Sequence, residues 1–257
     1  LGPVAPSGGE IVTGARVEAI VEHRDELSVV TEDGREYSAP VVVCNLAPRD
    51  TLPLLDESAL PTDWVERVRS VRGSGNAHQI KFALRRPLIE EGCLIAGVSL
   101  SGHTLADLSL DLMRDTVTAI DAGRVSDPMA IYAPVPTNYD ASLGPDGKQL
   151  VVASIYGPLR SDPADPPEVW RERVLAAFAS ILPGFWQELE WVEWTSVPDV
   201  GLWMGKSNNA AISNGQWPGQ VGADRLPVVT PVPGLFFAGD GAGGRGIGTE
   251  LATASGM

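Results

Sequence analysis

The sequence predicts an α/β protein, because strand-like and helix-like patterns alternate along its 257 residues. Residues 16–21 alternate apolar and other side chains, as a strand with one buried face does. Residues 166–182 repeat apolar side chains with a helical period, and Pro183-Gly184 ends that pattern. Close to Met257, a short apolar strand at 235–238 runs into a glycine-rich turn and a helix-like segment.

The first fifty residues predict a three-stranded meander that leads into a central strand. The three strands are expected at 10–22, 27–31 and 36–39, and Asp33-Gly34 is a tight-turn dipeptide. The continuous apolar run 41–44 is typical of a strand buried on both faces.

The middle of the chain mixes both patterns. Strands are expected at 77–84, 129–135 and 150–156, and helices at 61–69, 104–120 and 166–182. For the second of these helices, Thr104 is the expected N-cap, with Asp107 three residues on. Residues 201–220 show no period and mix glycines, amides and large aromatic side chains, which predicts a functional loop.

Composition excludes several classes of function. The chain carries 33 Asp+Glu against 19 Lys+Arg, a net charge of −14, so a nucleic acid partner is not expected. Cys44 and Cys93 lack metal-ligand spacing, and we expect both to be reduced and buried, with no metal site. We expect neither a signal peptide nor a transmembrane segment, and therefore a cytoplasmic protein, free or peripheral to a membrane.

The glycine-rich turn after strand 235–238 is the segment that suggests chemistry. Glycines let backbone N–H groups approach a ligand closely, and the following helix directs further N–H groups toward it. A carboxylate at Asp240 can accept hydrogen bonds from sugar hydroxyls. By spacing alone, a tight strand-to-helix turn without a ligand explains the same residues, and the chain has no N-terminal GxGxxG.

The segment Pro233-Gly-Leu-Phe-Phe-Ala-Gly-Asp-Gly followed by Gly-Gly-Arg-Gly-Ile-Gly resembles the C-terminal FAD motif of the phytoene desaturase-like family. That family belongs to the glutathione-reductase-type flavoproteins and is related to the amine oxidases. Four further segments resemble family segments in the same order: 14–20, 41–48, 140–148 and 182–185.

The resemblance implies a partial FAD-binding domain of the glutathione-reductase type, with an inserted mixed-sheet α+β substrate domain. The FAD-binding parts are expected at 1–50 and 228–257, and the substrate domain at 51–227. The chain looks like the C-terminal portion of such a protein without its N-terminal Rossmann unit. The resemblance therefore implies that a second chain supplies the missing half, or that this chain is a fragment.

The resemblance also implies a set of cofactor-binding residues: Val17, Asn45, Gly239, Asp240, Gly241, Gly248 and Thr249. Asp240 would bond the ribityl chain or the pyrophosphate, and the backbone at Gly248 and Thr249 would face the flavin. The backbone of Val17 would meet the adenine, and the segment around Asn45 would pass close to the ADP. Val17 as a core residue and Asn45 as a helix cap are the alternatives.

The implied activity is FAD-dependent dehydrogenation of an apolar, polyene-like substrate by hydride transfer to flavin N5. Trp203 and Trp217, which flank the aperiodic loop, are the candidate substrate-binding residues. No catalytic acid or base is assigned, since a lone histidine such as His78 or His103 is more often structural. A flavin amine oxidase and a non-catalytic pseudo-flavoprotein that binds a ligand are the alternatives.

Overall fold

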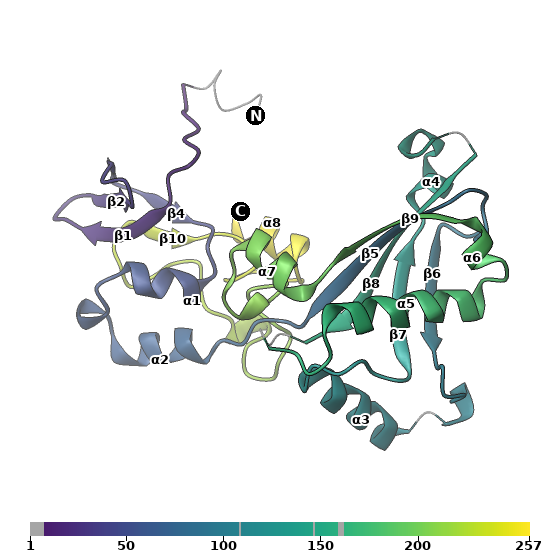
Figure 1. Ribbon diagram of the computed structural model, residues 1–257. Helices are drawn as coiled ribbons and strands as arrows, with labels where there is room; N and C mark the ends of the chain where they lie inside the picture. Colours follow the sequence, from purple (N-terminus) through teal and green to yellow (C-terminus); the bar gives the residue numbers. More distant parts are fainter. Residues whose placement is uncertain (1–7, 108, 146, 159–161) are drawn as a thin grey trace. The chain divides into compact units, whose positions relative to one another are not determined.

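The computed structural model describes residues 8–107, 109–145, 147–158 and 162–257 (Figure 1). The chain forms two compact units. Unit 1 comprises residues up to Arg72 together with Ser213–Met257, and unit 2 comprises Gly73–Ile212. The domain boundaries expected from the sequence lie at 50/51 and 227/228, whereas the compact units divide at 72/73 and 212/213.

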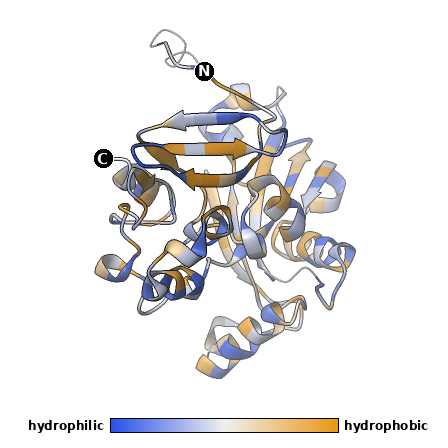
Figure 2. Ribbon diagram, turned by 90° about the vertical axis from the view of Figure 1, so that its left-hand side faces the viewer, coloured by the Kyte–Doolittle hydropathy of each residue, from blue (hydrophilic) through white to orange (hydrophobic). Residues whose placement is uncertain are grey.

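The predicted meander is present in unit 1. Strands β1 (Val17–Glu22), β2 (Leu27–Thr31) and β3 (Glu36–Ala39) pair antiparallel in the order β1-β2-β3. Figure 2 shows their apolar residues in orange. Gly34 turns the chain between β2 and β3 with a φ of 80°, which glycine adopts without strain.

Strand β4 (Val42–Cys44) pairs in parallel with β10 (Leu235–Phe237), with Val42 opposite Leu235. The segments around β4 and β10, far apart in the sequence, therefore share one sheet. The prediction that 41–44 is buried on both faces is wrong, because Val41 and Val43 are 54% and 62% exposed. Only the Cys44 face of β4 packs into the apolar core, together with Leu235 and Phe237.

The remaining elements of unit 1 are short. They are α1 (Pro48–Thr51), η2 (Leu52–Leu54), η3 (Glu57–Ala59), α2 (Thr62–Ser70), η7 (Gly222–Asp224) and α8 (Thr249–Ser255). Helix α2 buries Val65 and Val68 against Leu52 and Leu226, which joins the two sequence segments of unit 1 in a second small core.

Unit 2 is built on a five-stranded antiparallel sheet in the order β6-β7-β8-β5-β9. The strands are β5 (Asn76–Leu84), β6 (Cys93–Val98), β7 (Met129–Pro134), β8 (Gln149–Gly157) and β9 (Leu189–Thr195). Helix α5 (Pro167–Ile181) covers one face, where Phe178 packs edge-on against Phe82. The sequence patterns did not predict β6 and β9, the two edge strands.

Both ends of unit 2 are held together by hydrogen bonds. The N–H of Ser74 donates to the carbonyl of Ile212, and the N–H of Ile212 donates to Oγ of Ser74, both at 2.9 Å. The chain therefore enters and leaves unit 2 at two segments that lie side by side.

The predicted helix 104–120 begins later than expected. Thr104 and Asp107 do form a box, in which the N–H of Thr104 donates to Oδ2 of Asp107 at 2.6 Å, but only the 3-10 turn η4 (Leu105–Asp107) follows. The helix proper is α3 (Leu110–Asp121), capped by Ser109, whose Oγ accepts from the N–H of Leu112 at 3.1 Å. Leu108 lies outside the described residues.

The expected loop 201–220 is also partly helical. Helix α7 (Val197–Met204) begins with a capping box between Ser196 and Asp199 and ends at Gly205, whose φ is 62°. The other short elements of unit 2 are α4 (Pro136–Tyr139), η5 (Ala141–Leu143), α6 (Phe185–Glu188) and η6 (Ser207–Asn209).

Two expectations about side chains have mixed outcomes. Cys44 and Cys93 are both free, and Cys44 is buried as predicted. Cys93 is only half-buried, because β6 lies at the sheet edge.

In the described part of the chain, no helix is long and apolar enough to cross a membrane, and no cluster of acidic, histidine or cysteine side chains could hold a metal ion.

Candidate cofactor site

The carboxyl ends of β4 and β10 lie side by side and form the base of the candidate site. The N–H of Ala238 donates to the carbonyl of Cys44 at 2.9 Å, which extends the parallel ladder by one bond. Just beyond, Nδ2 of Asn45 donates to the carbonyl of Ala238 at 2.8 Å. Ligands of open parallel sheets bind outside these strand ends, so the geometry agrees with a ligand site here.

Gly239 allows the two strand ends to meet so closely. Its φ of +123° is a conformation that other residues rarely adopt. A Cβ at this position would lie 2.6 Å from Nδ2 of Asn45. The structure thus brings together two residues predicted to bind the cofactor, and packing inside the protein explains the need for glycine at 239.

Asp240 follows at once and joins the loop to a distant segment of unit 1. Its Oδ1 accepts from Oγ of Ser213 at 2.7 Å, and its Oδ2 accepts from the N–H of Ser213 at 3.2 Å. A carboxylate oxygen is also the kind of acceptor that sugar hydroxyls bind. Sequence reasoning missed Ser213, because nothing in its local pattern links it to residue 240.

The far end of the loop is formed by Gly248 and Thr249. Gly248 has φ 57° and ψ −121°, a backbone region open essentially to glycine alone, and Thr249 is the exposed first residue of α8. The N–H of Gly239 donates to Oγ of Ser255 at 2.7 Å, which ties the end of α8 to the beginning of the loop. Gly241 packs on α1, where an added Cβ would lie 2.5 Å from Cδ of Pro48.

The loop also presents polar backbone groups. Arg245, Gly246 and Ile247 are exposed, and within the described part of the chain the N–H groups of Arg245 and Ile247 donate no hydrogen bond. Such N–H groups are suitable donors for phosphate or flavin oxygens. The residues present therefore fit a flavin nucleotide, with donors from the loop and an acceptor from Asp240.

Val17 and the two tryptophans take part in none of the contacts described above. The half-buried side chain of Val17 packs against the apolar core of unit 1, beside a register shift between β1 and β2. Trp203 lies on α7 in unit 2 and is 70% exposed. Trp217 belongs to unit 1, where the guanidinium of Arg72 lies 4.2 Å above its ring.

His78 is a buried structural residue. Its Nδ1 accepts from the N–H of Val197 at 3.1 Å, and its ring lies against Trp170 and Trp194 at 4.6 and 4.9 Å. Burial lowers the pKa of His78 to about 4, and the nearby carboxylate of Asp199 only partly opposes this. The imidazole is therefore neutral at physiological pH.

The face of the unit 2 sheet opposite α5 carries large exposed side chains. Side chains alternate across strands, so residues next to buried core positions point to this second face. It presents Ile95, Tyr132, Tyr156 and Trp191, which are 43–77% exposed; these four are called the aromatic face below. On the same face, Nζ of Lys81 lies 2.7 Å from Oε1 of Glu193.

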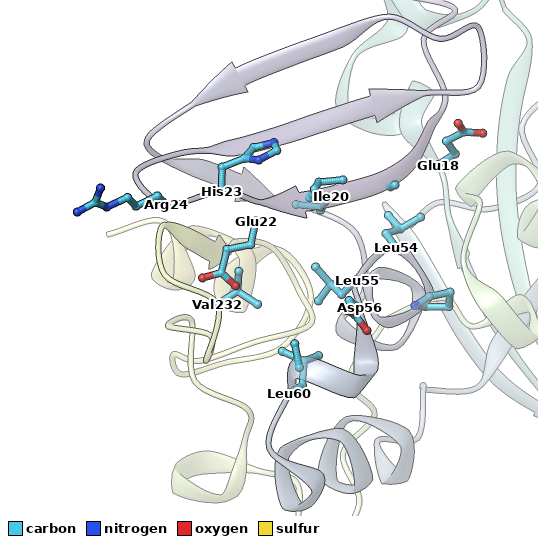
Figure 3. A pocket seen from close by; sticks show the side chains of 14 residues that line it. Glu18, Ile20, Glu22, His23, Arg24, Leu54, Leu55, Asp56, Leu60 and Val232 are labelled. Atoms are coloured by element: carbon cyan, nitrogen blue, oxygen red, sulfur yellow. The ribbon is translucent and has the colours of Figure 1, made fainter.

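A separate pocket of about 660 Å³ lies in unit 1 between β1 and the segment 53–60 (Figure 3). Its apolar floor includes Ile20, Leu55 and Val232, and its rim carries Glu18 and Glu22. None of the predicted cofactor-binding residues lines it. This pocket is therefore distinct from the glycine-rich loop.

Comparisons with known proteins agree with a flavoprotein fold. The model of a family described as flavin containing amine oxidoreductase matches residues 4–257. A comparison with curated proteins gave no match. An oxidoreductase from Methanosarcina mazei is similar in structure, with a TM-score of 0.58 and 19% identity, over 98% of this chain and 50% of that one.

Two oxidases that act on amines are also similar. Cyclohexylamine oxidase from Brevibacterium oxydans has a TM-score of 0.56 and 14% identity, over 93% of this chain and 46% of that one. Putrescine oxidase bound to putrescine has a TM-score of 0.54 and 14% identity, over 91% and 44%. The chain thus spans about half the length of these structures, and at these identities the likeness concerns the fold alone.

Proposed function

Because the chain belongs to the family of flavin-containing amine oxidoreductases, we propose that it carries the substrate-binding sheet and part of the FAD site of an oxidoreductase acting on an uncharged, apolar substrate. The cofactor of this family is FAD, as the glycine-rich motif led us to expect. The narrower likeness to phytoene desaturases, and with it desaturation of a polyene-like substrate, belongs to this proposal.

The observation that carries the proposal is the loop at the joined ends of β4 and β10. Gly239, Gly241 and Gly248 give it a course that brings backbone N–H groups to the surface. Asp240 supplies the acceptor for the ribityl hydroxyls, and the backbone near Thr249 supplies donors for the flavin ring. When bound, FAD supplies the group that accepts a hydride from a substrate carbon. The side chains of this chain bind and orient both molecules.

The aromatic face is the proposed substrate wall, and Trp203 and Trp217 remain candidate substrate-binding residues. Exposed apolar clusters of this kind mark ligand-binding surfaces more often than scattered single residues do.

On the described strands of this wall the charged side chains are Lys81 and Glu193, which form an ion pair with each other. Burial raises the pKa of the Tyr156 hydroxyl, and a further carboxylate, that of Asp121, lies close enough for its charge to raise this pKa as well. On the strands themselves a positively charged substrate would find the carboxylate already paired, which favours an uncharged substrate over an amine.

The test uses the complete polypeptide or complex that carries this chain, purified from its own cells. A visible spectrum with flavin absorbance is expected. Under anaerobic conditions, apolar alkenes such as phytoene should bleach that absorbance, whereas cyclohexylamine and putrescine should not. Absence of flavin would support the non-catalytic alternative, and bleaching by the amines alone would establish the amine oxidase alternative.

A further inference from the structure

Arg225 is a buried residue that holds the glycine-rich loop. It is 6% exposed, and its Nη2 donates to the carbonyl of Gly246 at 2.7 Å. Its Nη1 donates to the carbonyl of Gly244 at 3.3 Å. One guanidinium group thus binds two alternate carbonyl oxygens of the loop, in a geometry that lysine cannot reproduce.

The guanidinium is itself held on its other side. Oε1 of Gln216 accepts from Nη2 at 3.3 Å. With the amide of Asn214 oriented to satisfy its neighbours, the side-chain oxygen of Asn214 accepts from Nε of Arg225 at 3.2 Å. Asn214 is 1% exposed, so this support is enclosed by protein.

The guanidinium of Arg225 has no carboxylate partner in the described part of the chain. Among the residues that the structure describes, it forms no ion pair, and its bonds go to neutral carbonyl and amide oxygens. The guanidinium contributes positive potential at the loop. The carboxylate of Glu250, which lies beside Gly246, opposes it.

Peptide geometry shows what these bonds do to the loop. In a planar trans peptide, the carbonyl and the next N–H point in opposite directions. Because the carbonyls of Gly244 and Gly246 point toward Arg225, the N–H groups of Arg245 and Ile247 point away from it. Neither of these N–H groups has an acceptor in the described part of the chain, and the same holds for the N–H groups of Gly244 and Gly246.

We propose that Arg225 is a positioning residue that aims the N–H groups of Arg245 and Ile247 at acceptor oxygens of the bound FAD. This inference rests on the proposed function. The acceptors share one chemistry, an electron-rich oxygen, which both the flavin pyrimidine ring and the pyrophosphate offer. Arg225 itself touches the loop and not the cofactor.

The test compares Arg225→Gln and Arg225→Lys with Arg85→Gln in the complete FAD-bound protein. Arg85 is a matched control, because its Nη1 also donates to two backbone carbonyls, those of Gln187 and Leu189, but in unit 2. Gln216→Ala removes one support of the guanidinium and serves if Arg225→Gln does not fold. Riboflavin and ADP are titrated beside FAD to separate ring contacts from phosphate contacts.

Arg225→Gln should raise the Kd for FAD by about ten- to a hundredfold, as expected for the loss of charge-assisted bonds that order the loop. Trypsin should cleave the apo-protein after the exposed Arg245 several times faster, and the flavin midpoint potential should change. The Kd of Arg225→Lys for FAD should lie between those of the wild type and Arg225→Gln. Arg85→Gln should have the wild-type Kd. If Arg225→Gln weakens binding of riboflavin but not of ADP, the N–H groups contact the flavin ring. If it weakens binding of ADP but not of riboflavin, they contact the phosphates.

Two results separate the possible failures. If the wild-type protein binds no FAD, the proposed function fails. If it binds FAD and folded Arg225→Gln retains the same Kd, flavin potential and cleavage rate, the proposed function stands and the role of Arg225 is refuted. A lower melting temperature with all three quantities unchanged would likewise show a purely structural arginine.

Discussion

The side-chain amide of Asn45 donates a hydrogen bond to the backbone carbonyl of Ala238, across 193 positions of the sequence. This bond lies where β4 and β10 end, next to Gly239, and it joins the two chain segments that form the candidate site. Because Asn45 and Gly239 touch, their contributions to stability are coupled, and a double-mutant cycle measures the coupling.

Gly239→Ala should destabilise unit 1 by about 1–3 kcal/mol, because alanine is strained at a positive φ. Its Cβ would also lie 2.6 Å from Nδ2 of Asn45. Asn45→Ala alone should cost about 1 kcal/mol, the usual net value of one hydrogen bond. The double variant should cost less than the sum, because removing the amide relieves the clash. Urea unfolding measures all three, and strict additivity would contradict the packing described here.

Asp240→Ala should weaken FAD binding by about one to two orders of magnitude, because the carboxylate is the proposed acceptor for the sugar hydroxyls. Ser213→Ala is the matched control, since it removes the 2.7 Å bond to Asp240 and leaves the carboxylate in place. It should change FAD affinity by less than about threefold while costing about 1 kcal/mol of stability. Equal losses of affinity in both variants would reduce Asp240 to an anchor for Ser213.

Stability should depend on pH through His78. Burial lowers the pKa of His78 from 6.5 to about 4, so between these values the unfolded chain binds more protons than the native one. Stability is therefore complete above about pH 6.5 and falls as the pH drops toward 4, by on the order of 3 kcal/mol. His78→Phe should flatten this slope in urea unfolding curves, whereas the exposed His103→Gln should not. A wild-type slope in the His78 variant would disprove the assignment.

Lys81→Met should make the aromatic face accept cations. The variant leaves Glu193 without its partner at 2.7 Å, and an ammonium group can then pair with the carboxylate. Putrescine should inhibit or reduce the enzyme at roughly tenfold lower concentration, with less than about 1 kcal/mol change in stability, since the pair is half-exposed. Lys81→Met with Glu193→Gln is the control and should behave like the wild type. If the affinity for putrescine is unchanged in Lys81→Met, the proposal that Lys81 is part of the substrate wall is contradicted.

The parts of the site that the sequence could predict are those with a local pattern. Glycines at 239, 241 and 248 are required by local backbone conformation or close packing, and they stand in one short motif. Ser213 and Arg225 could not be found in this way, because their function arises from contacts with residues 19 to 27 positions away in a different loop. Hydrogen bonds of this kind leave no periodic signal.

The same reasoning explains the errors in the fold. The apolar run at 41–44 has the composition of a fully buried strand, yet its pairing with β10 alone leaves Val41 and Val43 exposed. The composition of a strand indicates how much apolar surface it could bury. The number of elements packed against the strand determines how much it does bury. Thr104 with Asp107 satisfies a capping box in a turn too short to become a helix, and Ser109 then caps α3.

The bonds between Ser74 and Ile212 have a consequence for how the chain folds during synthesis. Every residue of unit 2 leaves the ribosome before β10 does, because unit 2 lies between the two segments of unit 1 in the sequence. Once unit 2 has folded, Ser74 and Ile212 are already adjacent, and β4 and β10 no longer need to find each other across a long flexible chain. The entropy of closing that loop is then set only by the short stretches of unit 1 that remain between them. A late-arriving strand can thus complete an early-synthesised sheet, provided that the inserted unit has folded first.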